Sequence, residues 1–127
     1  MERKTLAKRH FYDGLNCAQS VLYSFKEDVN ISDSELLKLS AGFGGGMGKL
    51  QRTCGAVTGA FMVLALTDKF LIASDQTSRE STNDLIRNFD AEFVKIHKTT
   101  QCRELLGVDF LTEDGVKKFA RNVFTIL

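Results

Sequence analysis

The sequence predicts an all-α protein, a single-domain bundle of about five to seven helices spanning residues 1–127. Three observations predict it: proline is absent, apolar residues recur mostly at helical spacing, and no run alternates for the length of a strand. The composition is that of an ordinary globular protein, with 43% hydrophobic and 26% charged residues among 127. A chain of this length can bury one core of its own.

Most of the predicted helices have a recognisable start. A weakly amphipathic segment over residues 2–12 is interrupted by Gly14, and a helix resumes from about Asn16. A capping box at Ser32–Glu35 opens the helix over "LLKLSAGF". After a glycine-rich segment, "TCGAVTGAFMVLALTDKF" predicts an apolar helix with Thr53 as its N-cap.

Three further helices are predicted in the second half of the chain. A second capping box at Thr77–Glu80 opens the first, Thr100 and Gly107 bound a short second one, and the third runs from near Thr112 to the end. The expected apolar face of the first consists of Leu85, Phe89, Phe93 and Ile96, and that of the last of Val116, Phe119, Ala120, Val123 and Leu127.

Charge and hydropathy argue against several classes of function. A net charge of +1 gives no field that would recruit nucleic acid. The charged N-terminus, "MERKTLAKRHFYDG", offers no apolar stretch for a signal peptide. The longest near-apolar run, residues 56–66, falls well short of the about 20 residues that span a bilayer. We therefore expect a cytoplasmic protein that binds neither nucleic acid nor membrane, with its three cysteines mostly reduced.

All three cysteines fall near predicted helix starts: Cys17, Cys54 and Cys102. The unpaired N–H groups at a helix start favour a thiolate, so this placement predicts lowered pKa values. Cations flank two of the three in sequence: Lys49 and Arg52 precede Cys54, and Lys98 and Arg103 lie on either side of Cys102. Because free cysteine is also among the most buried residue types, reactive or ligating thiols and inert core thiols both stay open.

The segment "GFGGGMGKLQRTCGA", residues 42–56, carries six of the ten glycines. It lacks the "GxxxxGK[ST]" of a phosphate-binding loop and fails the third glycine of GxGxxG, so nucleotide binding is disfavoured. A loop with bare N–H groups and freedom for positive φ could instead wrap a sulfur, an anion or a cluster. The candidate cofactor-binding residues are Gly44, Gly45, Gly46 and Gly48. Beyond the loop, the four-residue spacing of Gly55 and Gly59 predicts close approach of another helix.

Metal-binding motifs are weak. The chain has no CxxC, CxxCH or HExxH. Cys17, Cys54 and Cys102 could form a zinc site together with one histidine. His97 lies on the wrong side of a helix start for this role, and His10 fits better on a helix face.

Three segments, "GLNCAQSVLYSF", "GFGGGMGKLQRTCGAVTGAFMVL" and "CRELLGVDF", resemble the successive blocks of the C_GCAxxG_C_C family of redox-active proteins. The resemblance runs in order over about residues 4–115. It implies a small helical protein with thiol redox or metal-cluster chemistry at Cys17, Cys54 and Cys102. The cofactor is unknown, and the candidates are an iron-sulfur cluster and zinc. Family members carry a fourth cysteine after the Gly-x-Asp element, which this chain lacks. A four-thiolate cluster from one chain is therefore excluded.

Two main hypotheses follow. In the first, the protein is an oxidoreductase or electron-transfer accessory in which Cys54 is the central catalytic thiol, Cys17 its near partner and Cys102 a third, with the substrate and redox partner unknown. In the second, it is a non-catalytic helical interaction module, a homodimer whose cysteines are structural or vestigial. A small-molecule carrier that uses the bundle interior is a third.

Overall fold

The computed structural model describes residues 2–107 of the chain. Within this range the chain forms six α-helices, two short 3-10 helices and no strand, which confirms the all-α prediction. The α-helices are α1 (Arg3–Tyr12), α2 (Cys17–Tyr23), α3 (Asp33–Ser40), α4 (Gly55–Thr67), α5 (Gln76–His97) and α6 (Cys102–Leu106), and the 3-10 helices are η1 (Lys26–Asp28) and η2 (Ala41–Phe43). The last predicted helix, from near Thr112, lies outside the described residues.

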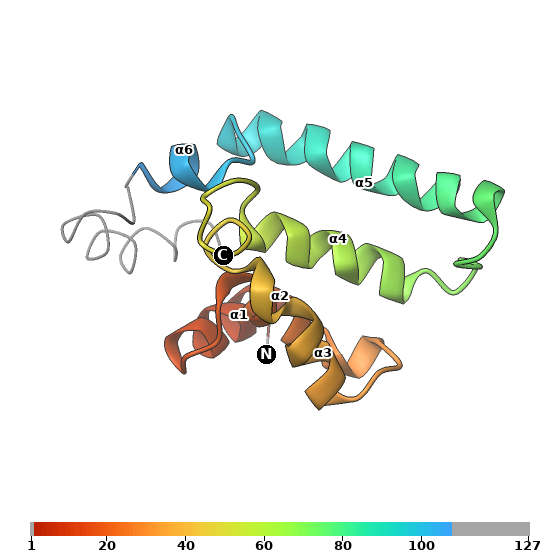
Figure 1. Ribbon diagram of the computed structural model, residues 1–127, viewed down its shortest axis with the longest axis horizontal. Coiled ribbons are helices and arrows are strands. Elements are labelled where there is room, and N and C mark those ends of the chain that lie inside the picture. Colours follow the sequence, from red (N-terminus) through yellow and green to blue (C-terminus); the bar gives the residue numbers. More distant parts are fainter. Residues whose placement is uncertain (1, 108–127) are drawn as a thin grey trace.

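Helix α4 lies at the centre of the bundle, between α5 on one side and the group formed by α1, α2 and α3 on the other (Figure 1). The closest packing is between α2 and α4. A Cβ atom added at Gly59 would lie 2.9 Å from the carbonyl oxygen of Ala18, so a side chain there would push the two backbones apart. The spacing of small residues therefore serves close helix packing, as the sequence predicts.

Among residues 2–107, two apolar clusters contribute to the core. One joins Leu22, Leu36 and Val63, which come from α2, α3 and α4. The other contains Cys54 together with Ala56 and Val57 at the start of α4, and it is covered by Val21, Phe61, Phe89, Phe93 and Leu105. One of the three cysteines is thus an integral part of a core cluster.

Three of the predicted helix starts are displaced by one or two residues. The N-cap of α4 is Cys54 and not Thr53. The N-cap of α5 is Asp75, whose carboxylate accepts from the backbone N–H of Ser78 at 2.9 Å, so the predicted Thr77 box is wrong. The short helix α6 is capped by Gln101 and not by Thr100. In all three cases the local pattern indicated a helix correctly. Contacts between the two segments decide where α4 and α6 begin, whereas the local cap at Asp75 decides where α5 begins.

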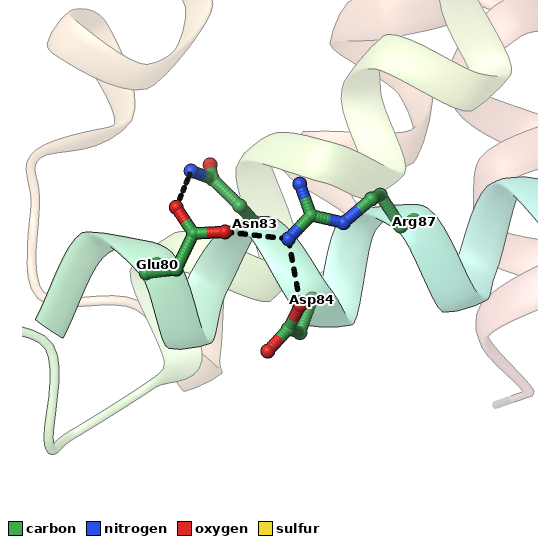
Figure 2. A network of polar contacts seen from close by, with 4 residues as sticks. All are labelled: Glu80, Asn83, Asp84 and Arg87. Carbon is green, nitrogen blue, oxygen red and sulfur yellow. Dashed lines mark hydrogen bonds and ion pairs between the residues drawn. The ribbon is translucent and has the colours of Figure 1, made fainter. Parts of the chain in front are cut away.

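The apolar face predicted for α5 is only half correct. Phe89 and Phe93 pack on the cluster around Cys54, but Leu85 and Ile96 are 42% and 71% exposed. The opposite side of α5 is polar. Figure 2 shows the side chain of Arg87 bridging the carboxylates of Glu80 and Asp84, with N–O distances of 2.6 Å to each.

No helix among the described residues is both long enough and apolar enough to cross a membrane.

Candidate functional site

The three cysteines are buried and unpaired. Cys17 is the first residue of α2, Cys54 caps α4, and Cys102 is the first residue of α6, so each lies at a helix start as the sequence predicts. Their exposed fractions are 4%, 3% and 3%, and all three are free thiols. The side chains therefore belong to the protein interior in this state.

Cys17 is held between the glycine loop and the start of α4. Its Cβ would lie 2.9 Å from a Cβ added at Gly55, so the residue after Cys54 must be glycine for α2 to approach this closely. From the other side, the backbone N–H of Gly45 forms a hydrogen bond with the Cys17 sulfur. The position of this thiol is therefore fixed by two segments that are distant from it in sequence.

Asn16 anchors the same region and was not singled out from the sequence. Its side chain accepts from the backbone N–H of Gln19 at 2.9 Å. The backbone N–H of Asn16 donates to the side-chain oxygen of Gln19 at 3.0 Å, which completes a capping box. The Asn16 amide also donates to the carbonyl of Ala41 at 2.8 Å and lies where a side chain at Gly44 would be. The motif Asn-x-x-Gln, an N-cap residue with glutamine three residues later, was the sequence signal that could have revealed this residue.

A short antiparallel contact brings Cys54 and Cys102 to the same place. Thr53 and Gln101 form an isolated β-bridge. The backbone N–H of Cys54 donates to the carbonyl of Thr100 at 2.8 Å, and that of Cys102 donates to the carbonyl of Arg52 at 2.5 Å. The bridge makes the two cysteines diagonal neighbours, and it explains why Thr53 and Thr100 do not cap helices.

Burial raises the pKa of all three thiols, which corrects the lowered values that the helix starts and flanking cations predict. For Cys17, burial in first place and the neighbouring Cys54 and Cys102 in smaller measure together raise the pKa to about 12. For Cys102, burial and, in smaller measure, Cys54 raise the pKa to about 12, while Arg103 opposes the increase. Loss of hydration therefore outweighs the N–H groups and the cation.

Cys54 is the common neighbour of the other two cysteines. Burial raises its pKa as well, but the backbone N–H groups of Ala56 and Val57 face its sulfur and act in the opposite direction. Its ionisation would disfavour ionisation of both Cys17 and Cys102. Electrostatically, the three thiols form one coupled group with Cys54 at its centre.

The glycine loop is a tight turn in which a run of residues has positive φ. Five successive residues, Gly45 to Lys49, have φ values between 61° and 75°, and Gln51 follows at 58°. Hydrogen bonds close the turn, with Gly48 N–H donating to the Gly42 carbonyl at 2.7 Å and Gln51 N–H to the Gly45 carbonyl at 3.0 Å. Three residues of the turn are not glycine, and the left-handed conformation costs each about 1–2 kcal/mol. The loop is thus a strained segment that its hydrogen bonds and burial hold in place.

The glycines expected to bind a cofactor each have a packing or hydrogen-bonding reason within the fold, and cofactor binding by them stays a prediction. Gly44 leaves room for Asn16, and Gly46 leaves room for the backbone of Gln51 and Arg52, each with a would-be Cβ contact of 2.6 Å. Gly45 provides an N–H for the Cys17 sulfur. The N–H of Gly48 is used inside the loop. Within this loop, the N–H of Gly45 faces the Cys17 sulfur, and the expectation that the loop wraps a sulfur, an anion or a cluster stays a prediction.

The residues present do not assemble a metal centre. Between residues 2 and 107, no group of three or more His, Cys, Asp or Glu side chains is arranged to hold a metal ion. His10 stacks edge-on against Tyr23, and His97 lies against Phe93, with ring centroids 4.9 Å and 4.4 Å apart. The described residues thus do not gather Cys17, Cys54 and Cys102 into a zinc or iron-sulfur ligand set, and the sulfurs of Cys17 and Cys54 instead face backbone N–H groups.

One comparison with known proteins gives a family match that includes all three cysteines. The family described as "Putative redox-active protein (C_GCAxxG_C_C)" matches residues 15–123, from just before Cys17 to well beyond Cys102. The chain belongs to the C_GCAxxG_C_C family. No curated protein and no solved structure matches the chain. The three cysteines and the left-handed glycine loop all lie within the part that matches the family.

Proposed function

We propose that this member of the C_GCAxxG_C_C family is a thiol–disulfide redox protein of the cytoplasm, acting as an oxidoreductase or electron-transfer accessory. The observation that carries the proposal is that the Thr53–Gln101 bridge and the contact of Cys17 with Gly55 bring three buried thiols together around Cys54. Cys54 would form a disulfide with Cys17 or Cys102. Each such event removes two protons and two electrons, and the electrons pass to a disulfide of a partner molecule, which is reduced to two thiols.

The environment of Cys54 favours its role as the central thiol. Two backbone N–H groups, from Ala56 and Val57, stabilise a negative charge on its sulfur. Cys17 and Cys102, with pKa values raised to about 12, stay protonated at neutral pH. Cys54 therefore attacks the disulfide of the partner first and releases one partner thiol, and Cys17 or Cys102 then loses its proton as it attacks the mixed disulfide and releases the second. Because Cys54 is 3% exposed, the reaction requires a local opening at the start of α4.

A redox titration with single-cysteine variants tests the proposal. The wild-type protein is equilibrated in glutathione buffers whose potentials run from about −180 mV to more reducing values. Each sample is quenched in acid, alkylated and analysed by intact mass. We expect an intramolecular disulfide in the wild type, in Cys17→Ala and in Cys102→Ala, and none in Cys54→Ala. A disulfide that forms equally in Cys54→Ala, or no disulfide in any variant at the oxidising end, would overturn the assignment.

A helical homodimer that serves as an interaction module is a second candidate. It is favoured by α4, because its sequence GAVTGAFMVLALT is uncharged and several of its apolar residues are only half-buried. Phe70 and Ile72, which follow α4, are 80% and 61% exposed. Sedimentation of a variant with all three cysteines changed to alanine tests this function. A dimer that persists in the variant supports it, and a monomer at all concentrations contradicts it.

A further inference from the structure

A groove of about 690 Å³ lies on the outer side of the glycine loop. It is bounded by the end of α1, by Asn16 and by the loop itself, and five of its ten lining residues are glycines. Gly45 belongs both to this wall and to the surroundings of Cys17, whose sulfur it contacts through its N–H. The groove therefore runs next to a buried thiol, separated from it by a bare backbone.

Gly42 is a glycine that the fold does not require. Each of the other glycines among the described residues has either a positive φ or a would-be Cβ contact under 3.0 Å. Gly42 has neither, because a Cβ added there meets no atom within 4 Å. It sits in η2 on the wall of the groove. Internal packing thus gives no reason for a bare position here, whereas the close approach of a ligand gives one.

Lys49 lines the same groove and is the reverse case, a residue with a side chain where the backbone conformation favours glycine. Its φ is 61°, a conformation in which glycine would be unstrained, yet the residue is lysine. Its side chain is exposed and makes no ion pair within the part of the chain that the structure describes. A lysine whose backbone is strained, at the edge of a groove, is suited to a functional role. The role that a lysine ammonium fits best here is to bind a negative group.

We propose that this groove binds a small carboxylate-bearing molecule of about tripeptide size, with its carboxylate on Lys49, its backbone over Gly42 and its apolar part against Phe11 and Leu15. The volume is typical of a small-molecule site. If the thiol–disulfide function proposed above holds, the natural ligand is a low-molecular-weight thiol or its disulfide, because the groove is separated from Cys17 only by Gly45.

The binding step is tested without redox chemistry by using S-methylglutathione, a thioether that cannot exchange with thiols. Amide chemical shifts of the reduced, full-length protein are followed during the titration. We expect saturable changes centred on Gly42, Gly48 and Lys49, with a dissociation constant of about 1 mM or tighter. Absence of saturation, or changes centred elsewhere, would overturn the proposal.

Matched variants sharpen the test. Gly42→Leu should fold normally and weaken binding at least about tenfold, while Ala73→Leu, at an exposed site far from the groove, should not. Lys49→Gln should weaken binding, and Lys38→Gln, on the exposed side of α3, should not. Equal affinity for the wild type and Gly42→Leu contradicts the groove assignment.

The two proposals fail in different ways. Binding of S-methylglutathione without any disulfide formation would keep the groove and reject the redox function. Oxidation by glutathione disulfide at the wild-type rate in Gly42→Leu would keep the redox function and reject the groove as its substrate site.

Discussion

Raising the pH should destabilise this protein through its buried thiols. Cys17 has an ordinary pKa of 9.0 when unfolded and a pKa of about 12 when folded. Below pH 9 the thiol is protonated in both states and contributes nothing to the pH dependence. Between pH 9 and 12 the unfolded chain gives up the proton while the folded chain keeps it. The free energy of unfolding therefore falls by about 1.4 kcal/mol for each pH unit in this window.

The assay is urea-induced unfolding in the presence of a non-thiol reductant, at pH values of about 8 and 10. Over this range Cys17 alone should remove about 1.4 kcal/mol of stability, and Cys102 acts in the same direction. Lysines and tyrosines also begin to titrate near the upper limit. We therefore take the difference between the wild type and Cys17→Ala, which cancels the groups that the two proteins share.

We expect that difference to shrink by about 1.4 kcal/mol as the pH rises from about 8 to about 10. Ser20→Ala is the control, because Ser20 lies on the same helix and is fully buried but does not titrate. Its difference from the wild type should not change with pH. A wild-type advantage over Cys17→Ala that is the same at both pH values would refute the reasoning, because it would mean that the Cys17 thiol is not desolvated.

Three other predictions concern the loop, the helix contact and thiol access. Lys49→Gly should raise the free energy of unfolding by about 0.5–1 kcal/mol, because relief of left-handed strain exceeds the added freedom of the unfolded chain, while Lys49→Ala should not. Gly59→Ala should lower the free energy of unfolding by about 1–3 kcal/mol through its contact with α2, whereas Gly42→Ala should leave it unchanged. Equal effects of the two substitutions in thermal unfolding would contradict this prediction. Alkylation of the native reduced protein at neutral pH should be slow at all three cysteines and fast after denaturation, and a rapidly modified native thiol would count against their burial.

The helices of this protein could be predicted from local sequence because their signals are local. Periodic apolar residues and caps such as Ser32, whose hydroxyl accepts from the N–H of Glu35 at 3.1 Å, are complete within a few residues. The exact starts of α4 and α6 could not be predicted, because the bridge between Thr53 and Gln101 joins segments almost fifty residues apart in sequence. That contact also uses the threonines that a local reading assigns to caps.

The candidate site was predictable in its residues but not in its electrostatics. A cysteine at a helix start can be recognised from the sequence, but its hydration cannot, and hydration decided the direction of the pKa shifts. The glycine loop shows the same limit. Its glycines indicated positive φ values, yet Met47, Lys49 and Gln51 adopt them as well, at 66°, 61° and 58°. Nothing in the side chain of a methionine or a lysine indicates such a conformation, which the closed hydrogen-bonded turn imposes.

The contacts of Gly45 predict that ligand binding and oxidation are coupled. Gly45 lines the groove and also hydrogen-bonds to the Cys17 sulfur. A disulfide between Cys17 and Cys54 would draw this sulfur toward α4 and away from the Gly45 N–H, which changes the wall that a ligand meets. Binding energies must be reciprocal, so a ligand that prefers the reduced protein tenfold raises the reduction potential by about 30 mV. Redox titrations with and without saturating S-methylglutathione measure this shift. Identical potentials, together with identical affinities for the oxidised and reduced protein, would show that the groove and the thiols act independently.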